Sequence, residues 1–125
     1  MRVTVVDKGL HQPLAYVPFL DRFRREPSEF VFLTAAEFGS SIVRKNPLDV
    51  VKAFQRAFED SDLNVRLLIK IREVNPGHWS NIDSYWEEIE ERIAGDDRIA
   101  LVEGNLTNEE YWTLMWSVDA MVSLH

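Results

Sequence analysis

The feature that most constrains the fold is the run at residues 30–36, Phe-Val-Phe-Leu-Thr-Ala-Ala, which is apolar at nearly every position. A strand with one face in water alternates apolar and polar residues, and this run shows no such alternation. Both faces of the strand are therefore expected to be covered, as they are in the centre of a parallel sheet with helices on its two sides. The run predicts an α/β domain built around a central parallel strand.

A polar loop and an amphipathic helix follow this strand. Residues 37–41 are small and polar enough to turn, and Asn46 and Pro47 are typical of the N-cap and the first position of a helix. The apolar side chains that follow recur at spacings of three and four, which predicts one buried helix face: Val50, Val51, Phe54, Ala57 and Phe58. A helix N-terminus carries free N–H groups and partial positive charge, and Arg44 and Lys45 precede this one. The pattern indicates a candidate anion site.

This anion site has a plainer alternative, because a basic dipeptide before a helix is more often a solvated pair than a ligand contact. The chain contains neither the glycine fingerprint of dinucleotide-binding folds nor a phosphate loop ending in Gly-Lys-Ser. His11, His78 and His125 are far apart and have no ligand spacing, and the pair Asp96-Asp97 follows Gly95 in what is predicted to be a turn. No metal site or resident cofactor is therefore expected.

Length and composition favour a single domain that is soluble in the cytoplasm. The chain has 125 residues, 46% of them hydrophobic, which is enough for one core. It has no cysteine, which fits a reducing compartment, and no apolar run long enough for a membrane span or a signal peptide. The net charge of −7 disfavours nucleic acid as a partner, although local cations could still hold a compact anion.

The rest of the chain alternates strands and helices. Residues 2–6 predict a short strand, and residues 10–27, with two prolines, predict a connector. Thr107 and Glu110 have the spacing of a capping box for a helix that turns Tyr111, Leu114, Met115 and Val118 inward. Further strands are expected at 65–71, 98–102 and 120–124, and a further helix at 82–93. Four strands alternating with three helices predict a partial Rossmann-like, three-layer domain, with a parallel sheet of about four strands and helices on both faces.

In such sheets ligands bind beyond the carboxyl ends of the strands. The last predicted strand stops at His125 with no loop after it, so part of a binding site is expected to be missing.

The order of these residues resembles the C-terminal, donor-binding domain of family-four glycosyltransferases of the GT-B type, whose full enzymes pair two Rossmann-like domains across a cleft. The resemblance covers most of the chain. It is carried by Ser40, by Arg-Lys-Asn-Pro at 44–47 before a helix with Ala53-Phe54, and by Ser-Leu-His at 123–125. In one branch of that family Ser-Leu-His leads into an acidic Glu-Gly-Phe-Gly type loop, which this sequence does not contain.

The resemblance implies a role for the chain and for two groups of residues. Lys45, with Arg44 and Ser40, would bind the diphosphate of a nucleotide-sugar donor of the UDP or GDP type, although many family members have an arginine where Ser40 stands. The backbone of Gly104, Asn105 and Leu106 would pack against the base. Residues 1–27 would be an interdomain strand and connector, and residues 28–125 a βαβαβαβ core. The chain would then be the donor-binding fragment of a retaining glycosyltransferase, with no catalytic residue of its own and inactive without the acceptor domain.

A non-catalytic role is the alternative. Trp112 and Trp116 share a helix face beside the predicted inward stripe, and they are either ordinary packing residues or a contact surface. A truncated Rossmann-like module would act through protein contacts, or form a homodimer through the last strand or through these two tryptophans.

Overall fold

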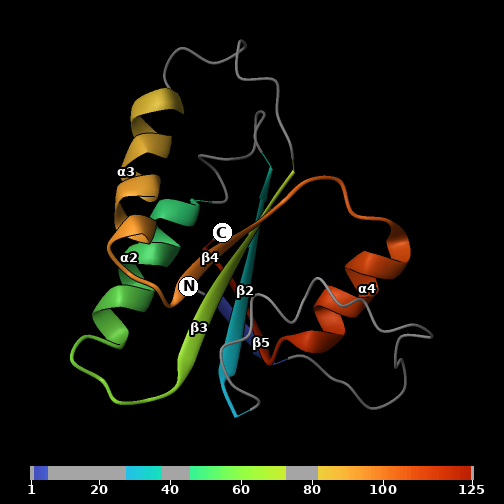
Figure 1. Ribbon diagram of the computed structural model, residues 1–125, viewed down its shortest axis with the longest axis horizontal. Helices are drawn as coiled ribbons and strands as arrows, with labels where there is room; N and C mark the ends of the chain where they lie inside the picture. Colours follow the sequence, from blue (N-terminus) through green and yellow to red (C-terminus); the bar gives the residue numbers. More distant parts are fainter. Residues whose placement is uncertain (1, 6–27, 38–45, 73–81, 125) are drawn as a thin grey trace.

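The computed structural model describes residues 2–5, 28–37, 46–72 and 82–124. Its strands and helices occur in the order β1 (Arg2–Val5), β2 (Phe30–Glu37), α2 (Pro47–Ala57), β3 (Val65–Arg72), α3 (Ile82–Ala94), β4 (Ile99–Glu103), α4 (Asn108–Ser117) and β5 (Ala120–Ser123). They form three layers, with α2 and α3 on one face of the sheet and α4 on the other (Figure 1). The predicted α/β class and the helices on both faces are confirmed.

The sheet has five strands in the order β1-β5-β2-β3-β4, and it is mixed. The strands β5, β2, β3 and β4 run parallel to one another, whereas β1 pairs antiparallel with β5, with Arg2 opposite Ser123. The predicted sheet of about four parallel strands was therefore incomplete. An antiparallel edge strand needs no helical crossover to join a sheet, so the alternation of strands and helices gave no sign of it.

The strand β5 lies between β1 and β2, which corrects the expectation that the last strand is available for a homodimer. Both sides of its backbone are already used in pairing, so it cannot act as an edge. In the part of the chain that the structure describes, the edge strands are β1 and β4. Both valines of β1, Val3 and Val5, are exposed.

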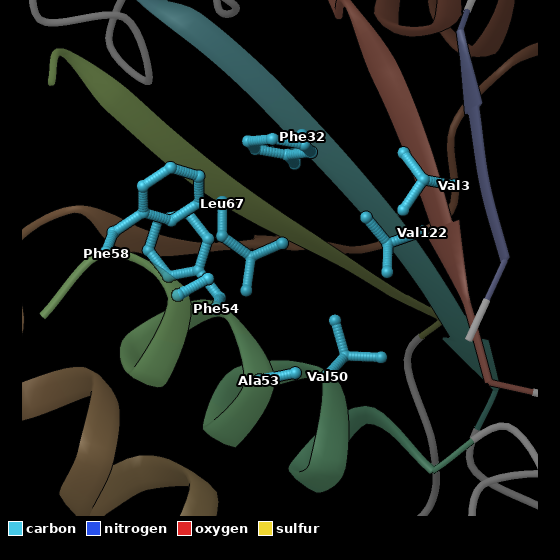
Figure 2. A pocket seen from close by; sticks show the side chains of 9 residues that line it. Val3, Phe32, Val50, Ala53, Phe54, Phe58, Leu67 and Val122 are labelled. Carbon is cyan, nitrogen blue, oxygen red and sulfur yellow. The ribbon is translucent and has the colours of Figure 1, made fainter.

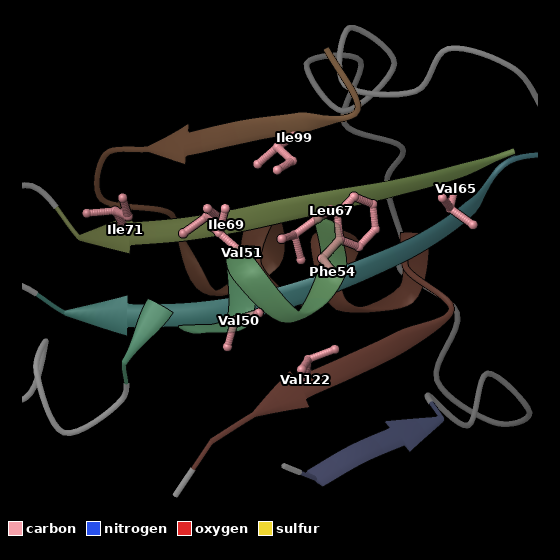
Figure 3. Close-up of a cluster of buried hydrophobic side chains, with 9 residues drawn as sticks. All are labelled: Val50, Val51, Phe54, Val65, Leu67, Ile69, Ile71, Ile99 and Val122. Atoms are coloured by element: carbon pink, nitrogen blue, oxygen red, sulfur yellow. The ribbon is translucent and has the colours of Figure 1, made fainter. Parts of the chain in front are cut away.

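The central strand β2 is covered on both faces, as predicted. On one face, α2 and β3 contribute most of a buried apolar cluster (Figure 3). Phe32 packs against this cluster, and its ring lies 6.1 Å from that of Phe54. Val31 and Leu33, which alternate with Phe32, are buried against the opposite face in a cluster with Leu114 of α4. The sheet therefore separates two apolar cores, one on each side.

The helix α4 begins as its sequence indicates, with Thr107 and Glu110 forming a capping box. Leu114 and Val118 are fully buried, but Tyr111 is 40% exposed, so the prediction that it faces inward is wrong. Its ring packs edge-on against the exposed Trp112 at 6.5 Å, where its hydroxyl can stay in water.

Candidate functional site

The strand order places a topological switch point between β2 and β5. From β2 the chain proceeds through β3 to β4 on one side, and then returns through α4 to β5 on the other side of β2. Because these strands are parallel, their carboxyl ends lie at one edge of the sheet. Ligands of open α/β sheets bind at that edge, where the loops after the two diverging strands leave a crevice. The strand β2 ends at this edge with Glu37, and the next described element in the chain is α2.

The helix α2 begins at this edge with Asn46 as its N-cap and Pro47 at its first position, as predicted. Asn46 adopts a left-handed conformation with φ of 49°, and its Oδ1 accepts a hydrogen bond from the backbone N–H of Asp49 at 3.3 Å. Its Nδ2 donates to the carboxylate of Asp49 at 2.6 Å. The first turn thus closes on itself through these two side chains.

Tyr85 of α3 completes the cap from outside the helix. Its hydroxyl accepts a hydrogen bond from the backbone N–H of Leu48 and donates one to Oδ1 of Asn46, both at 3.1 Å. Burial is the main reason why the pKa of Tyr85 is raised, and the negative charges of Asp49 and Glu88 act in the same direction. The sequence analysis placed Tyr85 only within the helix predicted at residues 82–93, without a role of its own. A tyrosine on a helix face that packs against another element needs a polar partner for its hydroxyl, and this was the signal in the sequence that could have singled out Tyr85.

These contacts change the expected anion site. Pro47 has no N–H, and the N–H groups of Leu48, Asp49 and Val50 donate to Tyr85, to the Asn46 side chain and to the Asn46 carbonyl. The prediction of free N–H groups at this helix end is therefore wrong for its first turn. The first-turn N–H groups of α2 already have acceptors within the protein and are not available to an anion. Ser40, Arg44 and Lys45 precede this helix in the sequence, and all three lie outside the described residues.

The second predicted segment, Gly104, Asn105 and Leu106, follows β4 at the same edge of the sheet. Gly104 has a φ of +105°, which favours glycine, Asn105 is exposed, and Leu106 packs against the apolar core below α4. Only β3 lies between β2 and β4, so with strands about 4.8 Å apart the two strand axes are roughly 10 Å apart. A nucleoside diphosphate would have to bridge that span.

Lys70 of β3 joins the ends of two strands at this edge, and sequence reasoning missed it. Its Nζ donates to the carbonyl of Gly104 at 2.7 Å and to that of Ile71 at 2.9 Å. The side chain is buried. A lysine inside an otherwise apolar strand run was the signal that could have singled it out.

An apolar cleft of about 200 Å³ lies between α2 and the β5 side of the sheet (Figure 2). Its lining contains only apolar side chains: Val3, Phe32, Val50, Ala53, Phe54, Ala57, Phe58, Leu67 and Val122. Because these side chains have no polar atoms, they cannot hydrogen-bond to phosphate or sugar hydroxyl groups. The cleft is therefore not the predicted donor site.

Asp96 lies in the turn that the sequence predicts and forms an ion pair with Arg98. Its carboxylate accepts two hydrogen bonds from the guanidinium of Arg98, at 2.8 and 2.7 Å. These bonds are the main reason why the pKa of Asp96 is lowered. Across residues 2–5, 28–37, 46–72 and 82–124, no three His, Cys, Asp or Glu side chains are grouped so that they could hold a metal ion.

Comparisons with known proteins identify no family for this chain. No protein-family model matches it, and no curated protein matches it. In the described part of the chain, no helix is both long enough and apolar enough to span a membrane.

Proposed function

We propose that this chain is the nucleotide-sugar donor-binding part of a retaining glycosyltransferase. The observation that carries the proposal is the switch point between β2 and β5, because Ser40, Arg44 and Lys45 follow β2 in the sequence. The resemblance of residues 40–54 and 119–125 to family-four enzymes supports the same assignment. Nucleotide, diphosphate and sugar would lie along the carboxyl edge.

The charge of the leaving group explains why cations are useful there. As the glycosidic bond breaks, negative charge accumulates on the nucleoside diphosphate, so fixed cations stabilise the transition state more than the ground state. Since the first-turn N–H groups of α2 are engaged within the protein, Lys45 and Arg44 are proposed to supply these contacts, with Ser40 beside them. Each charge-assisted hydrogen bond contributes about 1.5–3 kcal/mol.

The base is proposed to pack against Gly104, Asn105 and Leu106, whose position after β4 lies at the same edge. Neither group of residues performs chemistry on the sugar. The chain is therefore proposed to bind the donor and to need an acceptor domain for transfer.

Calorimetry with UDP and GDP tests this function. We expect binding at millimolar nucleotide or below, and an affinity at least about ten-fold lower in Lys45→Ala, the change that follows from losing one charge-assisted contact. Lys52→Ala is the matched control, because Lys52 is a lysine of α2 whose ion pair with Glu88 is exposed. Absence of heat at millimolar nucleotide, or equal losses in the two variants, would contradict the proposal.

A second candidate function is self-association of a non-catalytic module, with a second copy of this chain as the partner. The observation in its favour is Trp112, which is 62% exposed beside the exposed Tyr111, whereas Trp116 is only partly accessible. Large exposed aromatic side chains are typical of interface centres. Sedimentation velocity should then show a concentration-dependent dimer that Trp112→Ser abolishes. A monomer at all concentrations would refute it.

A further inference from the structure

Lys70 is a cation in a place that favours apolar side chains. It lies on the interior strand β3, paired with Ala35 of β2 on one side and Val102 of β4 on the other. Only 9% of the residue is exposed. Leu68, two residues earlier on the same face of the strand, is part of the apolar core below α4. An apolar residue at position 70 would avoid the desolvation of an ammonium group.

The ammonium of Lys70 is directed at the turn after β4. Its Nζ donates to the carbonyl of Gly104 at 2.7 Å and to that of Ile71, on its own strand, at 2.9 Å. Gly104 stands two residues beyond Val102, the register partner of Lys70, and has a φ of +105°. The ammonium therefore bridges the end of β3 and the first residue of the turn.

The other end of this turn is fixed as well. The N–H of Thr107 donates to the carboxylate of Glu110 at 3.1 Å, and the N–H of Glu110 donates to the hydroxyl of Thr107 at 3.1 Å. Between the two ends, Leu106 packs against the apolar core and Asn105 is exposed. The short segment from Gly104 to Leu106 is therefore anchored at its start, near its end and through one side chain.

We infer that Lys70 is the residue that positions the Gly104–Leu106 backbone to receive the base of a nucleoside diphosphate. This rests on the proposed function, which assigns the base to that segment. A base that is recognised by backbone atoms requires those atoms to be held in one conformation before binding. Lys70 holds this backbone in one conformation through its hydrogen bond to the Gly104 carbonyl, and it does not itself contact the ligand.

Two measurements on Lys70→Met test the inference, with Leu68→Met as the matched control on the same strand and face. The first is hydrogen exchange at the amides of Asn105 and Leu106, compared with amides of β3. We expect exchange of the two loop amides to be about ten-fold faster in Lys70→Met, as for the loss of one hydrogen bond to a charged group, and unchanged relative to β3 in Leu68→Met.

The second measurement is calorimetry with UDP, GDP and inorganic pyrophosphate. Lys70→Met should weaken the binding of both nucleotides about ten-fold and leave that of pyrophosphate unchanged, because pyrophosphate has no base. Gly104→Ala alters the residue whose carbonyl accepts from Lys70. If Lys70→Met does not fold, Gly104→Ala should likewise weaken the binding of both nucleotides and leave that of pyrophosphate unchanged.

Each other result overturns the inference. Unchanged exchange in Lys70→Met shows that the ammonium does not order the turn. Faster exchange with unchanged nucleotide affinity shows that the turn does not receive the base, and equal weakening of nucleotides and pyrophosphate shows a general loss of structure. Wild-type protein that binds none of the three compounds refutes the proposed function itself, and the exchange data then still report whether the Lys70 contact forms.

Discussion

Replacing Tyr85 by Phe should destabilise the protein through the N-terminus of α2. The substitution removes one hydroxyl that accepts from the Leu48 N–H and donates to Asn46. Leu48 is only 6% exposed, so its N–H loses its acceptor where water has little access. Leaving a buried donor without a partner costs about 1–3 kcal/mol, whereas Asn46 is half-buried and still accepts from Asp49. We therefore expect the free energy of unfolding to fall by about 2 kcal/mol.

Urea denaturation followed by tryptophan fluorescence measures this loss, and thermal melting should show a midpoint about 7 °C lower. Tyr111→Phe is the control, since the exposed Tyr111 hydroxyl should contribute less than about 0.5 kcal/mol. If the free energy of unfolding of Tyr85→Phe lies within about 0.5 kcal/mol of the wild-type value, the hydrogen bond from the Leu48 N–H to Tyr85 does not contribute to the cap of α2.

The pH dependence gives an independent check of the same contact. The pKa of Tyr85 is raised from its ordinary value of 10.0, mainly by burial. The folded protein therefore keeps the phenol proton more tightly than the unfolded chain does. The contribution of Tyr85 to stability is complete below pH 10 and is lost as the pH rises through the higher folded value. The difference in stability between wild type and Tyr85→Phe should accordingly shrink above pH 10.

Three further predictions concern turns and caps, and urea denaturation measures each of them. Asp96→Asn should lower stability by about 1–2 kcal/mol at neutral pH, because the partly buried bidentate contact with Arg98 loses its charge. The pKa of Asp96 in the folded protein is lowered from 3.8. The difference in stability between wild type and Asp96→Asn should therefore be complete above pH 3.8 and disappear as the pH falls through the lower pKa of the folded protein. Gly104→Ala should cost about 1–2 kcal/mol through its positive φ alone, because an added Cβ has no atom within 4 Å, whereas Gly95→Ala, without such a φ, should be neutral or stabilising. Thr107→Ala should cost about 1 kcal/mol by removing the N-cap of α4, and an unchanged midpoint would contradict the capping box.

Local signals in the sequence predicted most of the fold. The unbroken apolar run of β2, the Asn46-Pro47 start of α2 and the Thr107-Glu110 box of α4 all depend on neighbouring residues. Spacing and capping are encoded at that range. The pairing of β1 depends on residues at the other end of the chain, and a strand of four residues has no pattern that specifies its partner or direction.

The candidate site was predicted less well, for a related reason. Tyr85 and Lys70 act on elements other than their own, so their roles exist only once α3 has packed on α2 and β4 has paired with β3. In the sequence each looks like an ordinary member of a helix face or a strand. The assignments of Ser40, Arg44 and Lys45 to a diphosphate remain predictions from the resemblance.

The antiparallel ladder between Arg2–Val5 and Ala120–Ser123 has a consequence for how the protein forms during synthesis. Residues 2–5 are synthesised before residues 120–123, so they cannot form this pairing until residues 120–123 have also left the ribosome. Closing so large a loop is entropically costly and slow, so this ladder should be among the last contacts made by the nascent polypeptide. Until then the backbone N–H and C=O groups that pair in this ladder have no partner strand, which leaves an open strand edge on the nascent chain.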